Sequence, residues 1–229
     1  MADDPVFLIT GASSGIGAAT ARHAADAGYR VVLAARSTDK LQRIAEELGG
    51  PERALAVTCD VTDFGQQEAM VRAALDAFGR VDVALANAGF GGARGFLKES
   101  PEFWRDMVLT NVLGCAYTIR ATIPPLKESV GHLLLTSSVA GRRALSGSLY
   151  SATKHAVTAM AEAARQDLND TGIRVTSIEP GMTDTPFFDN RPSNALEPDD
   201  IARAIMFAVQ QPPHVDVNEI LIRPVSQPT

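Results

Sequence analysis

The chain has 229 residues, of which 45% are hydrophobic and 21% charged, a composition typical of a globular protein with a packed core. Its formal net charge is −6 and no block of basic residues interrupts it, which argues against nucleic acid and against an anionic membrane surface as partners. An α/β chain of this length forms one continuous core, so we expect a single domain over residues 1–229.

Short apolar or β-branched segments of strand length recur along the chain, and longer segments with apolar residues at helical spacing lie between them. The expected strands are residues 6–9, 30–35, 54–58, 81–86, 132–136, 173–178 and 219–222. Helices are expected over residues 16–27, 41–48, 66–78 and 151–168. Strands that are apolar throughout suit a sheet covered on both faces. The alternation predicts an α/β fold, a Rossmann-type doubly wound parallel sheet of about seven strands with helices on both faces.

Two further helices are expected in the second half of the chain. One is expected to begin after Ser100 and to end at Pro124 and Pro125, because proline lacks the backbone N–H that a helix interior needs. The polar segment 184–198 lies between the sixth expected strand and a last helix over residues 199–209. Its composition and position predict a mobile substrate lid.

The amino terminus and the cysteines indicate the compartment. Asp3 and Asp4 stand where a signal peptide carries positive charge, and no apolar run approaches the roughly 20 residues of a membrane span. Cys59 and Cys115 lie far apart in apolar stretches, as buried free thiols do. The four histidines show no ligand-like spacing, so no metal site is expected. We therefore expect a cytoplasmic protein that is not bound to a membrane.

A glycine-rich turn follows the first expected strand and opens the first expected helix, where residues 10–17 read TGASSGIG. Glycines let a pyrophosphate approach bare backbone, and the helix amino terminus offers free N–H groups. Three residues separate the first two glycines, whereas the usual dinucleotide fingerprint has one. An ordinary strand-to-helix turn is the alternative. The context favours a dinucleotide site formed by Gly11, Ser13, Ser14, Gly15, Ile16 and Gly17.

Arg36 follows the second expected strand, about 20 residues after the turn, where an NAD-binding chain carries an acidic residue for the ribose 2′-hydroxyl. A guanidinium there can bind a 2′-phosphate through charge-assisted hydrogen bonds. We therefore expect NADP(H) as the cofactor, with NAD(H) less favoured. The alternative is that Arg36 is an ordinary surface arginine.

Tyr150 and Lys154 are four residues apart at the start of an expected helix, so their side chains share one face. A neighbouring ammonium is expected to lower the pKa of the phenol and so make Tyr150 a workable general acid. Ser138 ends the fifth strand at the sheet edge where open α/β folds bind ligands, and its hydroxyl can polarise a carbonyl. Asn111 stands in an otherwise apolar helical run and needs a polar partner, which in the simplest case is a helix carbonyl.

Together these residues resemble the classical short-chain dehydrogenase/reductase family in its NADP-preferring form, over nearly the whole chain. Residues 10–17 match the family's T-G-x-x-x-G-x-G turn, and residues 87–89 match its N-A-G segment after the fourth strand. Asn111 matches its helix asparagine, and residues 180–185 resemble its P-G-x-x-x-T segment. The resemblance adds these expected cofactor contacts: Asp60, Val61, Asn87, Ala88, Gly89, Tyr150, Lys154, Pro180, Gly181, Thr183 and Thr185.

The resemblance also implies roles. Tyr150 would protonate the carbonyl oxygen as the nicotinamide delivers hydride, and Ser138 would orient the carbonyl. Lys154 would lower the Tyr150 pKa and hold the nicotinamide ribose, and Asn111 would position a water that links Lys154 to solvent. The expected activity is reduction of a small-molecule carbonyl to an alcohol, or the reverse reaction. The helices over residues 102–123 and 151–168 resemble the faces that pair in the family's homodimers and homotetramers.

Two departures from the family pattern and two rival functions stay open, and one departure is that the expected lid segment is short. The segment from Ser138 to Tyr150 is one residue shorter than in many members, and Arg142 and Arg143 fall within it. These arginines could bind an acidic substrate or lie in a solvated turn. A non-catalytic dinucleotide-binding redox sensor is the main rival, but it does not need Ser138, Tyr150 and Lys154 at reactive spacing. A sugar-nucleotide epimerase would be expected to have a longer chain and another glycine spacing.

Overall fold

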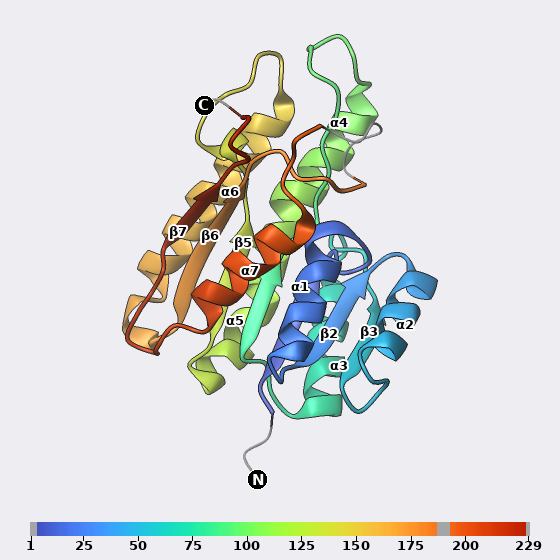
Figure 1. Cartoon of the computed structure of the whole chain (residues 1–229), viewed down its shortest axis with the longest axis vertical. Coiled ribbons are helices and arrows are strands. Elements are labelled where there is room, and N and C mark those ends of the chain that lie inside the picture. The colour runs from blue at the N-terminus through green and yellow to red at the C-terminus, as the bar shows by residue number, and fades with distance from the viewer. Residues whose placement is uncertain (1–3, 187–192, 228–229) are drawn as a thin grey trace.

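The computed structural model describes residues 4–186 and 193–227, and these residues form one α/β domain around a seven-stranded sheet (Figure 1). Neighbouring strands are parallel throughout, in the order β3-β2-β1-β4-β5-β6-β7. This order confirms the predicted Rossmann-type sheet. The strands are β1 (Val6–Thr10), β2 (Arg30–Ala35), β3 (Ala54–Thr58), β4 (Val83–Ala86), β5 (His132–Thr136), β6 (Arg174–Pro180) and β7 (Glu219–Ile222).

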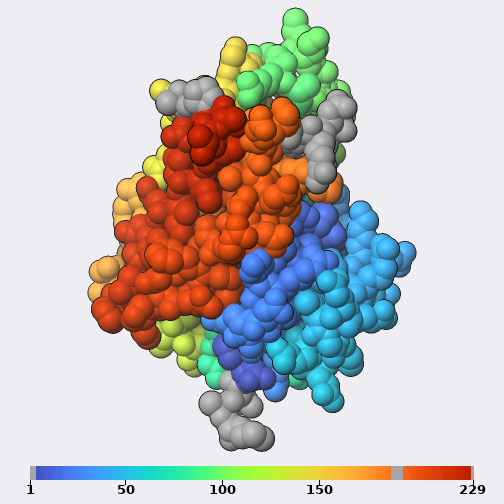
Figure 2. All heavy atoms as spheres, in the orientation of Figure 1, coloured from blue at the N-terminus to red at the C-terminus, as the bar shows by residue number. Residues whose placement is uncertain are grey.

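Helices cover both faces of the sheet. One face carries α1 (Gly15–Asp26), α2 (Thr38–Glu47) and α7 (Pro198–Val209), and Figure 2 shows α7 in orange lying against α1 in blue. The other face carries α3 (Phe64–Phe78), α5 (Cys115–Ser129) and α6 (Leu149–Asp167), with α4 (Pro101–Val108) before them. Among the described helices, none is long and apolar enough to cross a membrane.

The sheet is buried on both sides because successive side chains of a strand point to opposite faces. In β1, Val6 and Leu8 belong to the core beneath α3, α5 and α6. Phe7 and Ile9 belong to the core beneath α1, α2 and α7. All four side chains are fully buried, which explains why the strand has no polar alternation in the sequence.

The prediction that Pro124 and Pro125 end their helix is wrong, since α5 continues to Ser129. Each proline removes one backbone hydrogen bond, but Pro125 and Leu126 are buried, and Leu126 belongs to the core. Tertiary packing therefore outweighs the local helix-breaking preference. The chain turns only after Ser129, where Val130 has a φ of 50° and the Gly131 N–H donates to the Leu126 carbonyl at 2.9 Å.

The strand order creates a crevice between β1 and β4. The chain runs outward from β1 to β3, returns to β4 beside β1, and then runs outward the other way. Loops from the carboxyl ends of β1 and β4 therefore diverge, which is where open α/β sheets bind ligands. Of the predicted lid over 184–198, residues 187–192 lie outside the described residues. Near its base, the Asp184 N–H donates to the Leu196 carbonyl at 2.7 Å.

Candidate active site

A cleft of about 580 Å³ lies at the carboxyl end of the sheet. It brings together nearly all residues that the sequence analysis singled out. Of the residues expected in catalysis or at the cofactor, Gly17 and Asn111 are buried and do not line the cleft. The predicted residues in its lining are Gly11, Ser13, Ser14, Gly15, Ile16, Arg36, Asp60, Val61, Asn87, Ala88, Gly89, Ser138, Tyr150, Lys154, Pro180, Gly181, Thr183 and Thr185.

The glycine turn after β1 presents bare backbone to the cleft. Gly11 and Gly15 have φ values of +68° and +52°, a region that favours glycine. A side chain on Gly11 would come within 2.9 Å of the Ala88 Cα atom, and one on Gly17 would clash with the Gly11 carbonyl oxygen. These glycines are therefore required by the packing of the turn itself, and the backbone of Gly11 and Gly15 lines the cleft, where it suits a pyrophosphate.

Asn87 holds this turn in place. Its amide nitrogen donates to the carbonyl oxygen of Thr10 at 3.1 Å, and its amide oxygen accepts from the Thr136 hydroxyl at 3.2 Å. The Thr10 hydroxyl in turn accepts from the Asn87 backbone N–H at 3.0 Å. The side chain thus joins the ends of β1, β4 and β5 and fixes the floor of the crevice.

Arg36, Asp60 and Val61 lie on the β2 and β3 side of the cleft. Arg36 is exposed, and no ion pair joins it to another residue in 4–186 or 193–227. The Asp60 carboxylate accepts hydrogen bonds from the backbone N–H and hydroxyl of Thr62, at 3.0 and 2.8 Å. It is therefore held by its own turn, while the Arg36 guanidinium is available to an anion.

Gln67 supports this end of the cleft and was missed by the sequence analysis. It is fully buried, and its amide nitrogen donates to the carbonyl oxygens of Val61 and Gly114 at 2.8 and 2.9 Å. Its amide oxygen accepts from the Thr118 hydroxyl at 2.8 Å. A polar residue on the buried face of an expected helix was the available signal, but only the fold shows that it joins Val61 to the following helix.

Tyr150, Lys154 and Ser138 meet in the cleft as the spacing predicted. The Lys154 Nζ atom lies 5.7 Å from the centre of the Tyr150 ring and donates to the Thr136 carbonyl oxygen at 2.7 Å. Lys154 is only 5% exposed, and desolvation lowers its pKa to about 8. The Ser138 hydroxyl hydrogen-bonds to the Tyr150 side chain and accepts from the Ala140 N–H at 3.1 Å.

The pKa of Tyr150 differs from the sequence expectation. We expected the ammonium of Lys154 to lower it, but desolvation raises it to about 12, and the opposing influence is the hydrogen bond with Ser138. Burial disfavours the phenolate more than the surrounding groups favour it. The phenol is therefore protonated at neutral pH, which is the form that donates a proton.

Asn111 lies in a π-helical segment (Leu109–Gly114) that joins α4 to α5. Its amide oxygen accepts from the Phe90 N–H at 2.9 Å, and its amide nitrogen donates to the Phe90 carbonyl at 2.8 Å and to the Thr153 hydroxyl at 3.1 Å. The polar partner is thus the backbone of Phe90 rather than a helix carbonyl. The side chain fixes the segment that follows β4 against α6.

The segment after β6 closes the cleft opposite the glycine turn. The Gly181 N–H donates to the Ile222 carbonyl at 2.7 Å, and the Met182 N–H donates to the Gln227 side chain at 2.8 Å. A side chain on Gly15 would come within 3.0 Å of the Thr185 methyl group. Residues 180–185 and the turn therefore face each other across the cleft.

Arg142 does not line the cleft. Its guanidinium donates to the Glu179 carboxylate at 2.7 Å and also pairs with Glu219. These two carboxylates raise the pKa of the guanidinium above its usual value. Arg143 is exposed and is also absent from the lining. Both arginines are exposed in a turn, which agrees with the solvated-turn alternative, and Arg142 also joins this turn to β6 and β7.

Comparisons with known proteins identify the family to which the chain belongs. The family model described as short chain dehydrogenase matches residues 5–195. An uncharacterized oxidoreductase of Staphylococcus saprophyticus is 38% identical, over 97% of this chain and 98% of its own length. The alcohol dehydrogenase from the archaeon Thermococcus sibiricus, complexed with 5-hydroxy-NADP, is 34% identical with a TM-score of 0.92, and the match covers 98% of each chain.

A second solved structure is the closed form of a serine dehydrogenase complexed with NADP+. It is 30% identical, has a TM-score of 0.90, and the match covers 98% of this chain and 96% of that one. The fold and the glycine turn, together with these matches over nearly the whole chain, define an α/β oxidoreductase. The chain belongs to the short-chain dehydrogenase family.

Proposed function

We propose that this protein is an NADP(H)-dependent oxidoreductase that reduces a small-molecule carbonyl compound to an alcohol, or runs the reverse reaction, with Tyr150 as general acid or base. The observation that carries the proposal is that Ser138, Tyr150 and Lys154 share one cleft with the glycine turn. A proton donor, a hydroxyl that can bind a carbonyl oxygen, and a backbone anion site are thus assembled together.

The residues that would hold the cofactor fit a phosphorylated dinucleotide. The glycine turn would bind the pyrophosphate, Asp60 and Val61 would lie at the adenine, and Arg36 would bind the 2′-phosphate. Residues 180–185 would hold the nicotinamide end. The two solved relatives described above are complexes with NADP-type ligands, which supports the same class of cofactor here. When bound, NADPH supplies the hydride that reduces the carbonyl carbon.

Tyr150 supplies the proton in the direction of reduction. Its raised pKa keeps the phenol protonated at neutral pH, so a proton is available for the carbonyl oxygen as negative charge develops there. The Ser138 hydroxyl orients that oxygen. In the direction of oxidation the phenolate is the base, and it takes the proton of the alcohol hydroxyl.

Lys154 holds the ribose of the nicotinamide and adds positive charge beside Tyr150. Its ammonium already donates to the Thr136 carbonyl, which leaves further N–H donors for other groups. Asn111 helps to position the water through which Lys154 regains protons from solvent. Because its side-chain amide is bonded to Phe90 and Thr153, we propose that it acts by fixing the segment after β4.

A turnover screen tests the proposal against the redox-sensor alternative. The purified chain is mixed with NADPH or NADH and a panel of aldehydes and ketones, and the absorbance of the reduced nicotinamide is followed. Carbonyl-dependent loss of absorbance, faster with NADPH, supports the proposed function. Tight NADPH binding without turnover of any carbonyl compound would favour the sensor.

We also propose that the protein is a homodimer or homotetramer in the cytoplasm. An open groove of about 910 Å³ runs between α3, α5 and α6, and Ile119, Ile123 and Met160 are among its lining residues. It includes parts of the two helices that resemble the family's pairing faces. Cys59 and Cys115 are buried free thiols, which suits a reducing compartment. Light scattering on Met160→Glu should show loss of the larger species.

A further inference from the structure

Basic side chains outnumber acidic ones in the described lining of the cleft, although the whole chain carries a net charge of −6. Among the described residues that line it, Arg36, Arg94 and Lys154 are basic and only Asp60 is acidic. Arg36 lies on the β2 side, where the proposed function puts the cofactor phosphate, and Lys154 lies beside Tyr150. The role of Arg94 is left unassigned by the proposed function and by the family resemblance.

Hydrogen bonds on both sides of Arg94 fix the backbone that carries it. The Ala93 N–H donates to the Glu99 carboxylate at 2.7 Å, and the Gly95 N–H donates to the Gly147 carbonyl at 2.8 Å. A side chain on Gly147 would come within 2.7 Å of the Gly95 nitrogen, so the two segments are in direct contact. Arg94 is therefore held on the rim of the cleft rather than on a free loop.

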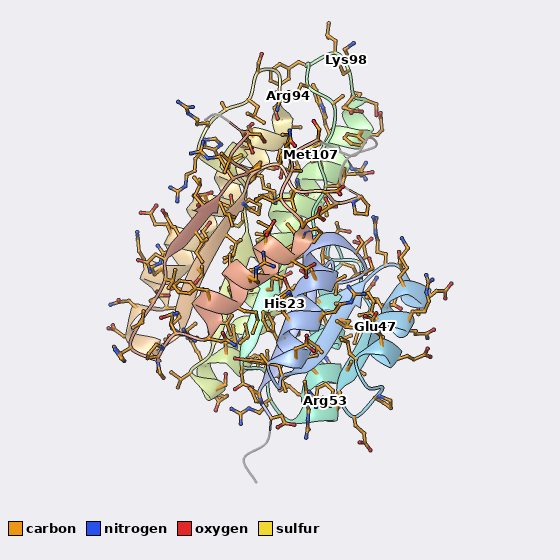
Figure 3. All side chains as sticks on the ribbon, viewed as in Figure 1. His23, Glu47, Arg53, Arg94, Lys98 and Met107 are labelled. Atoms are coloured by element: carbon orange, nitrogen blue, oxygen red, sulfur yellow. The ribbon has the colours of Figure 1, made fainter. Side chains whose placement is uncertain are left out.

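This part of the rim belongs to the reacting end of the cleft. Gly147, which contacts the residue after Arg94, lies three positions before Tyr150 in the chain. Figure 3 labels Arg94 at the end of the molecule where the segment after β4 meets the segment before α6. Apolar side chains of Phe90, Leu145 and Met182 also line the cleft. A small carbon skeleton could thus lie among apolar groups with a cation at the rim.

The Arg94 guanidinium has no acidic counter-ion among the described residues. No ion pair or hydrogen bond joins its side chain to another residue in the described part of the chain, and the nearby Glu99 carboxylate accepts the Ala93 N–H instead. The other arginines near Ser138 are not available to the cleft, because Arg142 is paired with two carboxylates and Arg143 does not line it. Arg94 is thus a rim cation of this end of the cleft that has no counter-ion in the described part of the chain.

We propose that Arg94 binds the carboxylate of the substrate, so that the preferred substrates are oxo acids and the corresponding hydroxy acids. A guanidinium matches a carboxylate with two parallel hydrogen bonds, and one unpaired cation balances one negative charge. This inference rests on the proposed function, because it names the substrate class of that same cleft.

Kinetics with a matched pair of aldehydes test the proposal. The full chain with NADPH is assayed on 4-carboxybenzaldehyde and on benzaldehyde, as the wild type and as Arg94→Gln, Arg94→Lys and Arg143→Gln. Arg94→Gln should raise the KM for 4-carboxybenzaldehyde about tenfold, the order expected for loss of a charge-assisted hydrogen bond, with little change in kcat or in the KM for benzaldehyde. Arg94→Lys should restore part of the loss, and Arg143→Gln should match the wild type.

A binding measurement separates this proposal from the proposed function. NADPH-loaded protein is titrated calorimetrically with 4-(hydroxymethyl)benzoate and with benzyl alcohol, neither of which NADPH can reduce. Tighter binding of the acid that is lost in Arg94→Gln supports the proposal even if neither aldehyde is turned over, a result that would reject the proposed function alone. Equal binding of acid and alcohol to the wild type, or an equal effect of Arg94→Gln on both aldehydes, overturns the role of Arg94.

Discussion

The ammonium nitrogen of Lys154 lies 5.7 Å from the centre of the Tyr150 ring, and the two groups carry oppositely shifted pKa values. Desolvation raises the pKa of Tyr150 to about 12 and lowers that of Lys154 to about 8. Burial thus favours the neutral form of both side chains. A protonated phenol suits the reduction of a carbonyl, whereas the oxidation of an alcohol needs the phenolate.

The two directions of the reaction should therefore respond differently to pH. Below its pKa the phenolate fraction of Tyr150 rises about tenfold per pH unit, so alcohol oxidation should speed up from pH 6 to pH 7.5, where Lys154 keeps its ammonium. Carbonyl reduction should not speed up over the same range. Initial rates in both directions, measured at constant ionic strength, check this. An oxidation rate that stays constant from pH 6 to pH 7.5 would contradict a raised Tyr150 pKa.

The Arg142–Glu179 pair should stabilise the turn after Ser138. Glu179 is only 1% exposed, so Arg142→Met would leave a buried carboxylate without its counter-ion. We expect a loss of about 3 kcal/mol in the free energy of unfolding, measured by urea titration. Arg142→Met combined with Glu179→Gln should recover part of that loss, because no charge then remains buried. A double variant less stable than Arg142→Met alone would refute this explanation.

His132 should make the protein less stable in acid. The Thr176 hydroxyl donates to the Val217 carbonyl at 2.6 Å, so its oxygen accepts from His132 Nε2 at 2.7 Å. His132 Nδ1 is buried and has no hydrogen-bond partner among the described residues. Desolvation lowers the pKa of His132 to about 3, whereas an unfolded histidine titrates near its ordinary 6.5. Between these values the unfolded chain binds the extra proton, so stability falls as the pH falls.

Unfolding titrations from pH 7 to pH 4 measure this effect. The contribution of His132 should approach about 1.4 kcal/mol per pH unit well below pH 6.5. His132→Gln, which keeps an amide donor for Thr176, should remove it, while the exposed His214 replaced by Gln should not. An unchanged acid dependence in His132→Gln would show that other groups cause it.

Arg36 should set the preference between the two nicotinamide cofactors. Arg36→Ala removes the cation proposed to bind the 2′-phosphate, so kcat/KM for NADPH should fall at least about tenfold while kcat/KM for NADH changes little. Arg43→Ala is the control, because Arg43 is exposed on the neighbouring α2 and does not line the cleft. If the wild type prefers NADH, or if the variant loses both cofactors equally, Arg36 does not select the cofactor.

The sequence was sufficient for the sheet and for most of the cleft because both depend on local patterns. The β1 side chains are apolar on both faces and the glycine turn follows them directly, so chain position alone places the cleft at that edge. The persistence of α5 through Pro124 and Pro125 was not predictable, because it depends on packing of Leu126 against distant strands.

Residues that act through the fold were also missed. Gln67 is one of many polar residues on an expected helix until its bonds to Val61 and Gly114 are known. Arg94 lies in a glycine-rich segment with no recognisable motif. Only the hydrogen bond between Gly95 and Gly147 shows that this segment lies at the rim of the cleft. The Tyr150 pKa was predicted in the wrong direction because desolvation depends on the surrounding fold and not on spacing.

The most direct test of the proposed function is the NADPH-dependent rate of carbonyl reduction by Tyr150→Phe, measured beside Tyr117→Phe and the wild type. Removal of the Tyr150 hydroxyl should lower kcat at least about a hundredfold, because that hydroxyl is the proton donor, while the dissociation constant for NADPH stays nearly the same. Tyr117→Phe should keep the wild-type rate, since Tyr117 does not line the cleft. A Tyr150→Phe variant as active as the wild type would contradict Tyr150 as the acid.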